Sequence, residues 1–138
     1  ETSNQVLMIE DERNIASGLR SLIDEIAPGK WEIHHIESLQ EVPEMLLERP
    51  ITLIILDLNL KESFGIMTLK DVLGRPGVPP VVVLTGEGND LQVPAFREGA
   101  IGFATKNALA LNPQGFVRFL ERRIGSQEQE SFDGGTET

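Results

Sequence analysis

The stretch Ile51-Thr52-Leu53-Ile54-Ile55-Leu56-Asp57 is the most apolar run of the chain, and it ends in a single acidic residue. Five of the six residues before Asp57 are large aliphatics, which predicts a strand buried on both faces of a parallel sheet. The carboxyl ends of parallel strands form the edge where open α/β sheets bind their ligands. Taken alone, Asp57 also fits an ordinary polar strand end that turns into a loop.

Three further apolar runs are each followed by charged or hydroxyl side chains. They are Glu10 and Asp11 after residues 6–9, Thr85 after residues 81–84, and Lys106 after residues 101–105. Strands and helical patterns alternate along the chain, which predicts βαβ units and a parallel sheet. In such a sheet these polar groups meet at one edge, so we expect a functional site there.

Composition limits the classes of function that this chain can have. A length of 138 residues fits one domain, and the formal net charge of −10 disfavours direct binding to nucleic-acid phosphates. The sequence has no cysteine, so disulfides and thiolate metal sites are excluded. Its apolar runs are far shorter than the ~20 residues of a membrane span, and no signal peptide is visible. We expect a cytoplasmic protein, and a first residue other than Met indicates a piece of a longer chain.

The expected fold class is α/β, with five strands, five helices and a C-terminal tail. Strands are predicted at 5–10, 31–36, 51–57, 81–84 and 100–105. Helices are predicted from the stripe Ile15 to Ile26, over 39–49, over 64–73, from near Pro94, and from an Asn112 cap with Pro113 in the first position. The domain is expected to cover residues 1–124, and 125–138 to form a linker or disordered tail.

The acidic residues at the predicted edge have a specific chemistry. Glu10, Asp11 and Asp57 cannot all ionise comfortably side by side, so either one of them binds a proton or a divalent cation joins them. Oxygen ligands without cysteine favour Mg²⁺ or Mn²⁺. Asp57 would then be a nucleophile that forms an acyl phosphate, with Lys106 and Thr85 contacting phosphoryl oxygens.

Over about residues 4–124 the chain resembles the receiver domains of two-component response regulators. That family has an acidic pair, a phosphoacceptor Asp, a Thr or Ser and a Lys in this order, here Glu10-Asp11, Asp57, Thr85 and Lys106. The neighbouring segments 57–60, 81–86 and 99–106 are also similar to the family. The resemblance implies a flavodoxin-like, doubly wound five-stranded sheet with strand order 2-1-3-4-5.

The resemblance also implies a mechanism. Asp57 would accept a phosphoryl group from a phosphohistidine on a sensor histidine kinase or phosphotransfer protein, in a self-catalysed reaction rather than as an enzyme with a diffusible substrate. Mg²⁺ would be held by Asp11, Asp57 and the backbone carbonyl of Asn59, with Glu10 acting largely through water. Thr85 and Phe103 would switch the face made by the fourth helix, the fifth strand and the last helix, although Phe103 fits plain core packing equally well.

Some positions differ from the usual family pattern. Asn107 replaces a common proline after Lys106, and Gly18-Leu19-Arg20-Ser21-Leu22-Ile23 is similar to LuxR-type transcription regulators. This implies a C-terminal output domain beyond residue 138, and it allows a phosphorylation-dependent homodimer. Asn59 and Glu87, two places after Asp57 and Thr85, predict a short phosphoryl lifetime. The alternatives are an unphosphorylated pseudo-receiver and an aspartyl-phosphate phosphotransferase or phosphatase.

Overall fold

In a computed structural model, the run that ends at Asp57 forms β3 (Leu53–Leu56) inside a parallel sheet. The structure describes residues 3–86 and 89–135. Its sheet has the order β2-β1-β3-β4-β5-β6, and every neighbouring pair is parallel. The other strands are β1 (Asn4–Ile9), β2 (Trp31–Ile36), β4 (Val81–Thr85), β5 (Gly102–Thr105) and β6 (Glu130–Phe132). The predicted order 2-1-3-4-5 is confirmed, with one strand added.

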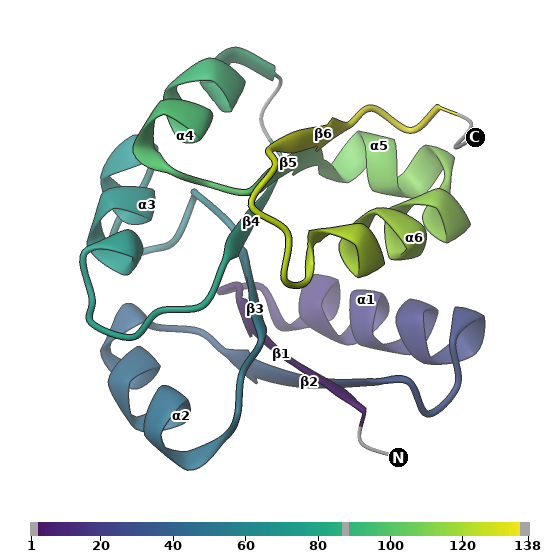
Figure 1. The fold of residues 1–138 in the computed structure, drawn as a ribbon, viewed down its shortest axis with the longest axis horizontal. Coiled ribbons are helices and arrows are strands. Elements are labelled where there is room, and N and C mark those ends of the chain that lie inside the picture. The colour runs from purple at the N-terminus through teal and green to yellow at the C-terminus, as the bar shows by residue number, and fades with distance from the viewer. Residues whose placement is uncertain (1–2, 87–88, 136–138) are drawn as a thin grey trace.

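Helices cover both faces of the sheet (Figure 1). One face carries α1 (Arg13–Ile26), α5 (Lys106–Leu111) and α6 (Pro113–Arg123). The other carries α2 (Val42–Glu48), α3 (Ile66–Leu73) and α4 (Gln92–Glu98). Short 3₁₀ turns at Leu39–Glu41 and Asn89–Leu91 lead into α2 and α4. None of the helices in the described part of the chain is long and apolar enough to cross a membrane.

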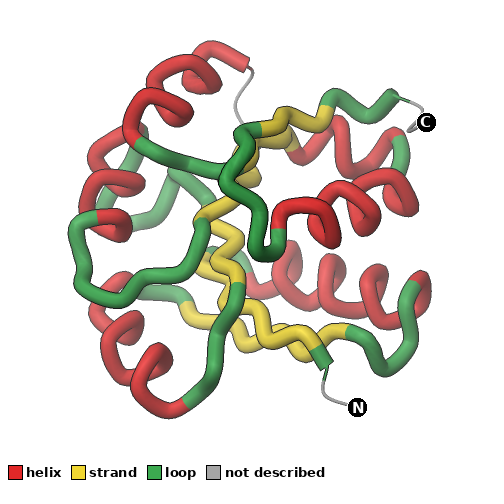
Figure 2. The backbone as a smooth tube through the Cα atoms, viewed as in Figure 1, coloured by secondary structure: helices red, strands yellow, loops and turns green. Residues whose placement is uncertain are grey.

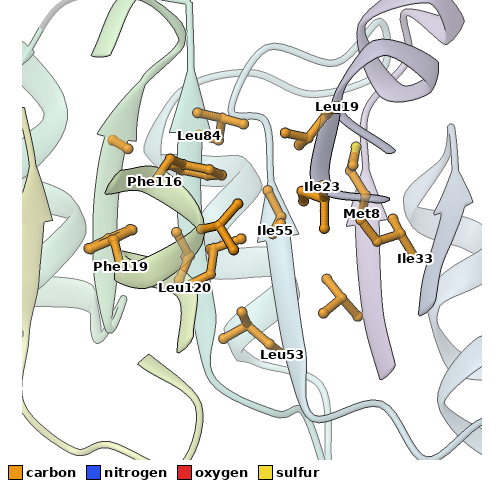
Figure 3. Close-up of a cluster of buried hydrophobic side chains, with 14 of the residues drawn as sticks. Met8, Leu19, Ile23, Ile33, Leu53, Ile55, Leu84, Phe116, Phe119 and Leu120 are labelled. Atoms are coloured by element: carbon orange, nitrogen blue, oxygen red, sulfur yellow. The ribbon is translucent and has the colours of Figure 1, made fainter. Parts of the chain in front are cut away.

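Each face of the sheet has its own hydrophobic core, because β1, β3 and β4 alternate their side chains between two buried faces. Figure 3 shows the core beneath α1 and α6, where Leu19 and Ile23 approach Ile55 from one helix and Phe116 and Leu120 from the other. The opposite core, beneath α2, α3 and α4, includes Leu56, Leu69 and Phe103. Burial on both faces explains why the sequence of β3 is continuously apolar.

The helix that contains Pro94 begins earlier than predicted. α4 starts at Gln92, two residues before Pro94, so the proline occupies its third position rather than the first. The first four N–H groups of a helix have no intrahelical acceptor, so a proline in this first turn removes no hydrogen bond from the helix. The prediction was therefore right about a short helix and wrong about its first residue.

The helix α5, directly after β5, was not predicted. Thr105 caps it, because the Thr105 Oγ1 accepts a hydrogen bond from the Ala108 N–H at 3.1 Å. Asn112 ends α5 and also caps α6, as its Oδ1 accepts from the Gly115 N–H at 3.0 Å. A helix of only six residues has too few turns to show a clear apolar period, although its cap residue is visible in the sequence.

The segment after α6 also differs from the expectation. Residues 130–132 form β6 and pair with β5, so a linker or disordered tail does not describe this part of the chain. Figure 2 shows the segment turning back from α6 to run along the sheet. Three residues are too short for a periodic pattern, and the strand depends on long-range contacts. Residues 136–138 of the expected tail lie outside the described residues, and the domain boundary at residue 124 stays a prediction.

Candidate functional site

Three charged side chains from different parts of the chain meet at the carboxyl edge of the sheet. The Lys106 Nζ lies 3.1 Å from the Asp57 Oδ2 and 2.9 Å from the Glu10 Oε1. Glu10 follows β1, Asp57 follows β3, and Lys106 follows β5. The two acids are almost fully buried, and the Lys106 side chain is 22% exposed. A single partly accessible ammonium group therefore contacts two buried carboxylates.

Backbone hydrogen bonds of the sheet fix both acids in place. The Asp57 N–H donates to the Ile9 carbonyl at 3.0 Å, and the Glu10 N–H donates to the Ile36 carbonyl at 3.1 Å. Both bonds extend the strand pairing by one residue beyond the strand end. The backbone that carries each carboxylate is therefore held in place by the sheet. His35 adds a contact through its Nε2, 2.6 Å from the Glu10 carbonyl oxygen.

The pKa values of the ionisable groups show the electrostatic strain of this arrangement. Burial raises the pKa of Glu10 to about 7, and Asp57 contributes to the rise, while Lys106 acts in the opposite direction. Burial lowers the pKa of Lys106, but its hydrogen bonds to Glu10 and Asp57 outweigh that effect, so its pKa is raised overall. The edge therefore holds more negative charge than one lysine can satisfy.

An acidic cluster lies beside this ion-pair network. Glu10, Asp11 and Glu12 can each place a carboxylate oxygen within 4.8 Å of the other two. Asp11 is half-buried and Glu12 is exposed, so the cluster opens towards solvent. Hard oxygen donors of this kind match the preference of Mg²⁺ and Mn²⁺, and the raised pKa of Glu10 marks a charge that a cation would relieve. Glu12 is absent from the predicted site, although it directly follows the predicted acidic pair.

Asn59 lies on the loop after β3 and is tied to the same carboxylate. Its backbone N–H donates to the Asp57 Oδ1 at 3.0 Å, and Asn59 pairs with Phe64 in an isolated antiparallel bridge. Asp57 thus receives an N–H on one oxygen and an ammonium group on the other. Glu87, which is predicted to act together with Asn59, lies outside the described residues.

Thr85 and Phe103 occupy the neighbouring strands. Thr85 is the last residue of β4, is fully buried and lies opposite Thr105, the residue before Lys106. Phe103 is also buried and lies opposite Val83. Because side chains alternate along a strand, Thr85 shares the face of Val83, and Phe103 packs in the same core as Val83. The two residues expected to switch therefore lie on one face of the sheet.

Comparison with known proteins agrees with this geometry. The model of the response regulator receiver domain family matches residues 6–111, which include all the predicted site residues. The chain belongs to this family. As a receiver domain, it has the parallel sheet with the strand order that the resemblance in sequence predicts.

Curated relatives include the transcriptional regulatory protein CpxR of Escherichia coli (strain K12), which is 28% identical over 137 residues. That match covers 98% of this chain and 57% of CpxR, so the chain spans little more than half the length of the relative. The CpxR protein of Shigella flexneri matches to the same extent.

Solved structures share the receiver fold. A LuxR family response regulator from Aurantimonas sp. SI85-9A1 has a TM-score of 0.76 at 20% identity, with 96% of this chain and 91% of that chain covered. A LuxR family DNA-binding response regulator from Silicibacter pomeroyi has a TM-score of 0.74 at 22% identity, with 94% and 96% covered. The phosphorylated cyanobacterial phytochrome response regulator RcpA has a TM-score of 0.71 at 20% identity, with 91% and 96% covered.

Proposed function

We propose that this receiver domain is a phosphoacceptor, in which Asp57 takes a phosphoryl group from a phosphohistidine on a sensor histidine kinase or phosphotransfer protein. The observation that carries the proposal is the pairing of Asp57 with Lys106 at the carboxyl edge of the sheet. A nucleophilic carboxylate needs a nearby cation to stabilise the charge of the phosphoryl group. The Asn59 N–H on the Asp57 Oδ1 orients the carboxylate for attack.

The transfer moves one phosphoryl group between two side chains. A carboxylate oxygen of Asp57 forms a bond to phosphorus while the P–N bond to the donor histidine breaks, and the imidazole nitrogen keeps the electron pair. Lys106 would then contact one phosphoryl oxygen, and the Thr85 hydroxyl would donate a hydrogen bond to a phosphoryl oxygen. Mg²⁺ or Mn²⁺, when bound, neutralises charge on the transferring phosphoryl group. The residues that would hold it are Glu10, Asp11, Asp57 and the carbonyl of Asn59, with Glu12 at the open side.

A switch of the output face follows from the same assignment. Phosphorylation adds negative charge that Lys106 and Thr85 can satisfy, and Thr85 shares its face of the sheet with Phe103. Movement of Thr85 would change the packing around Phe103 and hence the surface of α4, β5 and α6. We propose that this surface controls an output domain in a longer chain. Transcription is the output named for the CpxR relatives.

Intact mass after incubation with acetyl phosphate tests the proposal. We expect a gain of one phosphoryl group that requires Mg²⁺ and is absent from Asp57→Asn. Asp24→Asn is the matched control, because Asp24 is an exposed residue of α1. A wild-type chain that gains no mass would instead support a pseudo-receiver, which keeps the fold without the phosphorylation.

The lifetime of the phosphorylated form is a separate prediction. From the residue types at these two positions, an amide at Asn59 and an acid at Glu87, we expect hydrolysis to be fast for this class of acyl phosphate. The decay of the mass gain after removal of acetyl phosphate measures it. A phosphoprotein that stays intact for many hours with Mg²⁺ present would contradict the prediction.

A further inference from the structure

The C-terminal segment 129–135, which we call the strap, lies along the edge of β5 that faces away from β4. Within it, β6 pairs in parallel with β5 in the register Gly102 to Glu130, Phe103 to Ser131 and Ala104 to Phe132. The Glu130 N–H donates to the Ile101 carbonyl at 3.1 Å. In Figure 1 the strap continues past β6 towards α5. The strap therefore covers backbone groups that an edge strand would otherwise present to a partner.

Side chains fasten the strap to the helices on both sides of β5. The Gln129 Nε2 donates to the carbonyl oxygens of Phe96 and Ala100, at 2.7 and 2.9 Å. These carbonyls belong to the last turn of α4 and to the loop that follows it, so one amide ties α4 to the strap. The Glu130 carboxylate lies 2.5 Å from the Arg122 Nη2 and 2.7 Å from the Arg123 Nη2, both on α6.

An aromatic contact anchors the end of β6. Phe132 is 4% exposed, and its ring lies 5.9 Å from the Phe116 ring and 5.6 Å from the Phe119 ring, measured between centroids. The strap thus fills part of the core beneath α6. These contacts show that β6 is packed into the fold and does not merely lie on its surface.

The far end of the strap reaches the helix that begins at the site. The Asn112 Nδ2 donates to the Gly135 carbonyl at 2.9 Å. At Gly134, a Cβ would lie 3.0 Å from the Ala108 carbonyl oxygen, so the strap packs closely on α5 there. The first residue of α5 is Lys106, the partner of Asp57. One short helix therefore links the ion pair at the site to the end of the strap.

We infer that the strap is an autoinhibitory contact: it covers the face made by α4, β5 and α6, holds these elements in one arrangement, and opposes phosphorylation of Asp57. The inference rests on the proposed function of Asp57. If the phosphorylated arrangement moves β5 or α5, it must loosen the strap. By thermodynamic reciprocity, loosening the strap must then favour binding of a phosphoryl group at Asp57.

A full-length double variant, Gln129→Ala with Glu130→Gln, tests the inference. It removes the Gln129 hydrogen bonds to Phe96 and Ala100 and the Glu130 ion pairs with α6, and it leaves the site residues unchanged. Gln127→Ala with Glu128→Gln is the matched control, since both residues are exposed and lie outside β6. Hydrogen–deuterium exchange reports loosening of 129–132 and 96–104. Calorimetric titration with beryllofluoride, a phosphoryl analogue, in the presence of Mg²⁺ reports the affinity of the site.

We expect faster exchange in the double variant and binding of beryllofluoride about fivefold tighter than in the wild type, at the low end of usual coupling between sites. The control should match the wild type in both measurements. Asn112→Asp is a second variant, because aspartate keeps the cap oxygen but cannot donate to Gly135, and it should shift the affinity in the same direction.

The possible failures are distinct. The double variant could exchange faster in the strap and yet bind beryllofluoride with the same affinity as the wild type. That result would overturn the inference. The phosphoacceptor proposal would stand, provided that acetyl phosphate still adds mass to the wild type. Unchanged exchange in both variants would also overturn the inference, because these contacts would then not hold the strap. A wild type that gains no mass from acetyl phosphate and binds no beryllofluoride would remove both proposals.

Discussion

Lys106 carries two ion pairs at once, so the charge balance of the site depends on this one residue. Without it, the buried carboxylates of Glu10 and Asp57 would face each other without a cation. Breaking a buried pair by removing one partner is costly because the remaining charge stays desolvated. This single side chain therefore contributes both to stability and to the proposed chemistry.

Lys106→Met should lower the free energy of unfolding by about 3 kcal/mol at neutral pH without divalent cations, the lower end for a buried pair. Urea denaturation measures the change. Lys70→Met is the control, because Lys70 pairs with Glu98 at 3.8 Å on the surface and should lose less than about 1 kcal/mol. Equal losses in the two variants would show that the network at the sheet edge adds no stability.

Asp11 offers a prediction about the metal. A cation that binds the folded chain alone raises its stability by about 2.7 kcal/mol at a concentration 100 times its Kd. We therefore expect Mg²⁺ to raise the Tm of the wild type, and Asp11→Asn to remove most of this rise because it takes one carboxylate from the acidic cluster. Thermal unfolding with and without Mg²⁺ measures the effect. An Asp24→Asn control that lost the same response would refute a local site.

At the scale of elements, the packing of β5 against α6 leaves no room at Gly102. A Cβ added there would lie 2.9 Å from the Phe119 Cζ and 3.1 Å from the Val82 Cγ2. By contrast, Gly18 in α1 has nothing within 4 Å of such an atom. The same substitution should therefore have opposite effects on the two elements.

Gly102→Ala should destabilise the fold by about 1–3 kcal/mol through overpacking. Gly18→Ala should stabilise it by about 0.5–1 kcal/mol, because alanine is the better helix former and the position is exposed. Urea denaturation of both variants gives the two values. If Gly102→Ala were neutral, β5 and α6 would have to move apart easily, contrary to the close approach of Phe119 to Gly102.

For the molecule as a whole, docking of the strap should depend on pH. The Arg122 guanidinium beside Glu130, supported by Arg123, lowers the pKa of this carboxyl in the folded chain. A lowered folded pKa means that the stabilisation is complete above the unfolded pKa near 4.5 and is lost as the pH falls through the folded value. Since Glu130 is partly exposed, solvent screening limits the gain to about 1 kcal/mol.

Glu130→Gln should therefore lower the free energy of unfolding at pH 7, and the difference from the wild type should shrink as the pH falls below 4.5. Denaturation at several pH values measures this difference. Glu128→Gln is the control, because Glu128 contacts Arg123 through its backbone carbonyl rather than its carboxylate. A difference that grew in acid would have the wrong sign for a lowered pKa.

The sequence alone was sufficient to predict the receiver family, the α/β class and the order of the first five strands. The α/β class depends on local patterns, namely apolar runs of strand length, polar residues at their ends and the cap at Asn112. The strand order was implied by the resemblance to receiver domains. The residues that meet at the sheet edge were also predictable, since parallel strands place their carboxyl ends together. Their chemical roles stay predictions.

Only the tertiary structure decided the remaining features. Lys106 bridges both acids because β1, β3 and β5 are held in one register, and no local pattern contains a distance across 49 residues. Glu12 joins the acidic cluster through the turn that follows β1. β6 forms a strand because Phe132 packs against Phe116 and Phe119. A segment of three residues has no periodicity of its own that would predict a strand. Local patterns determine elements, whereas long-range packing determines which side chains meet.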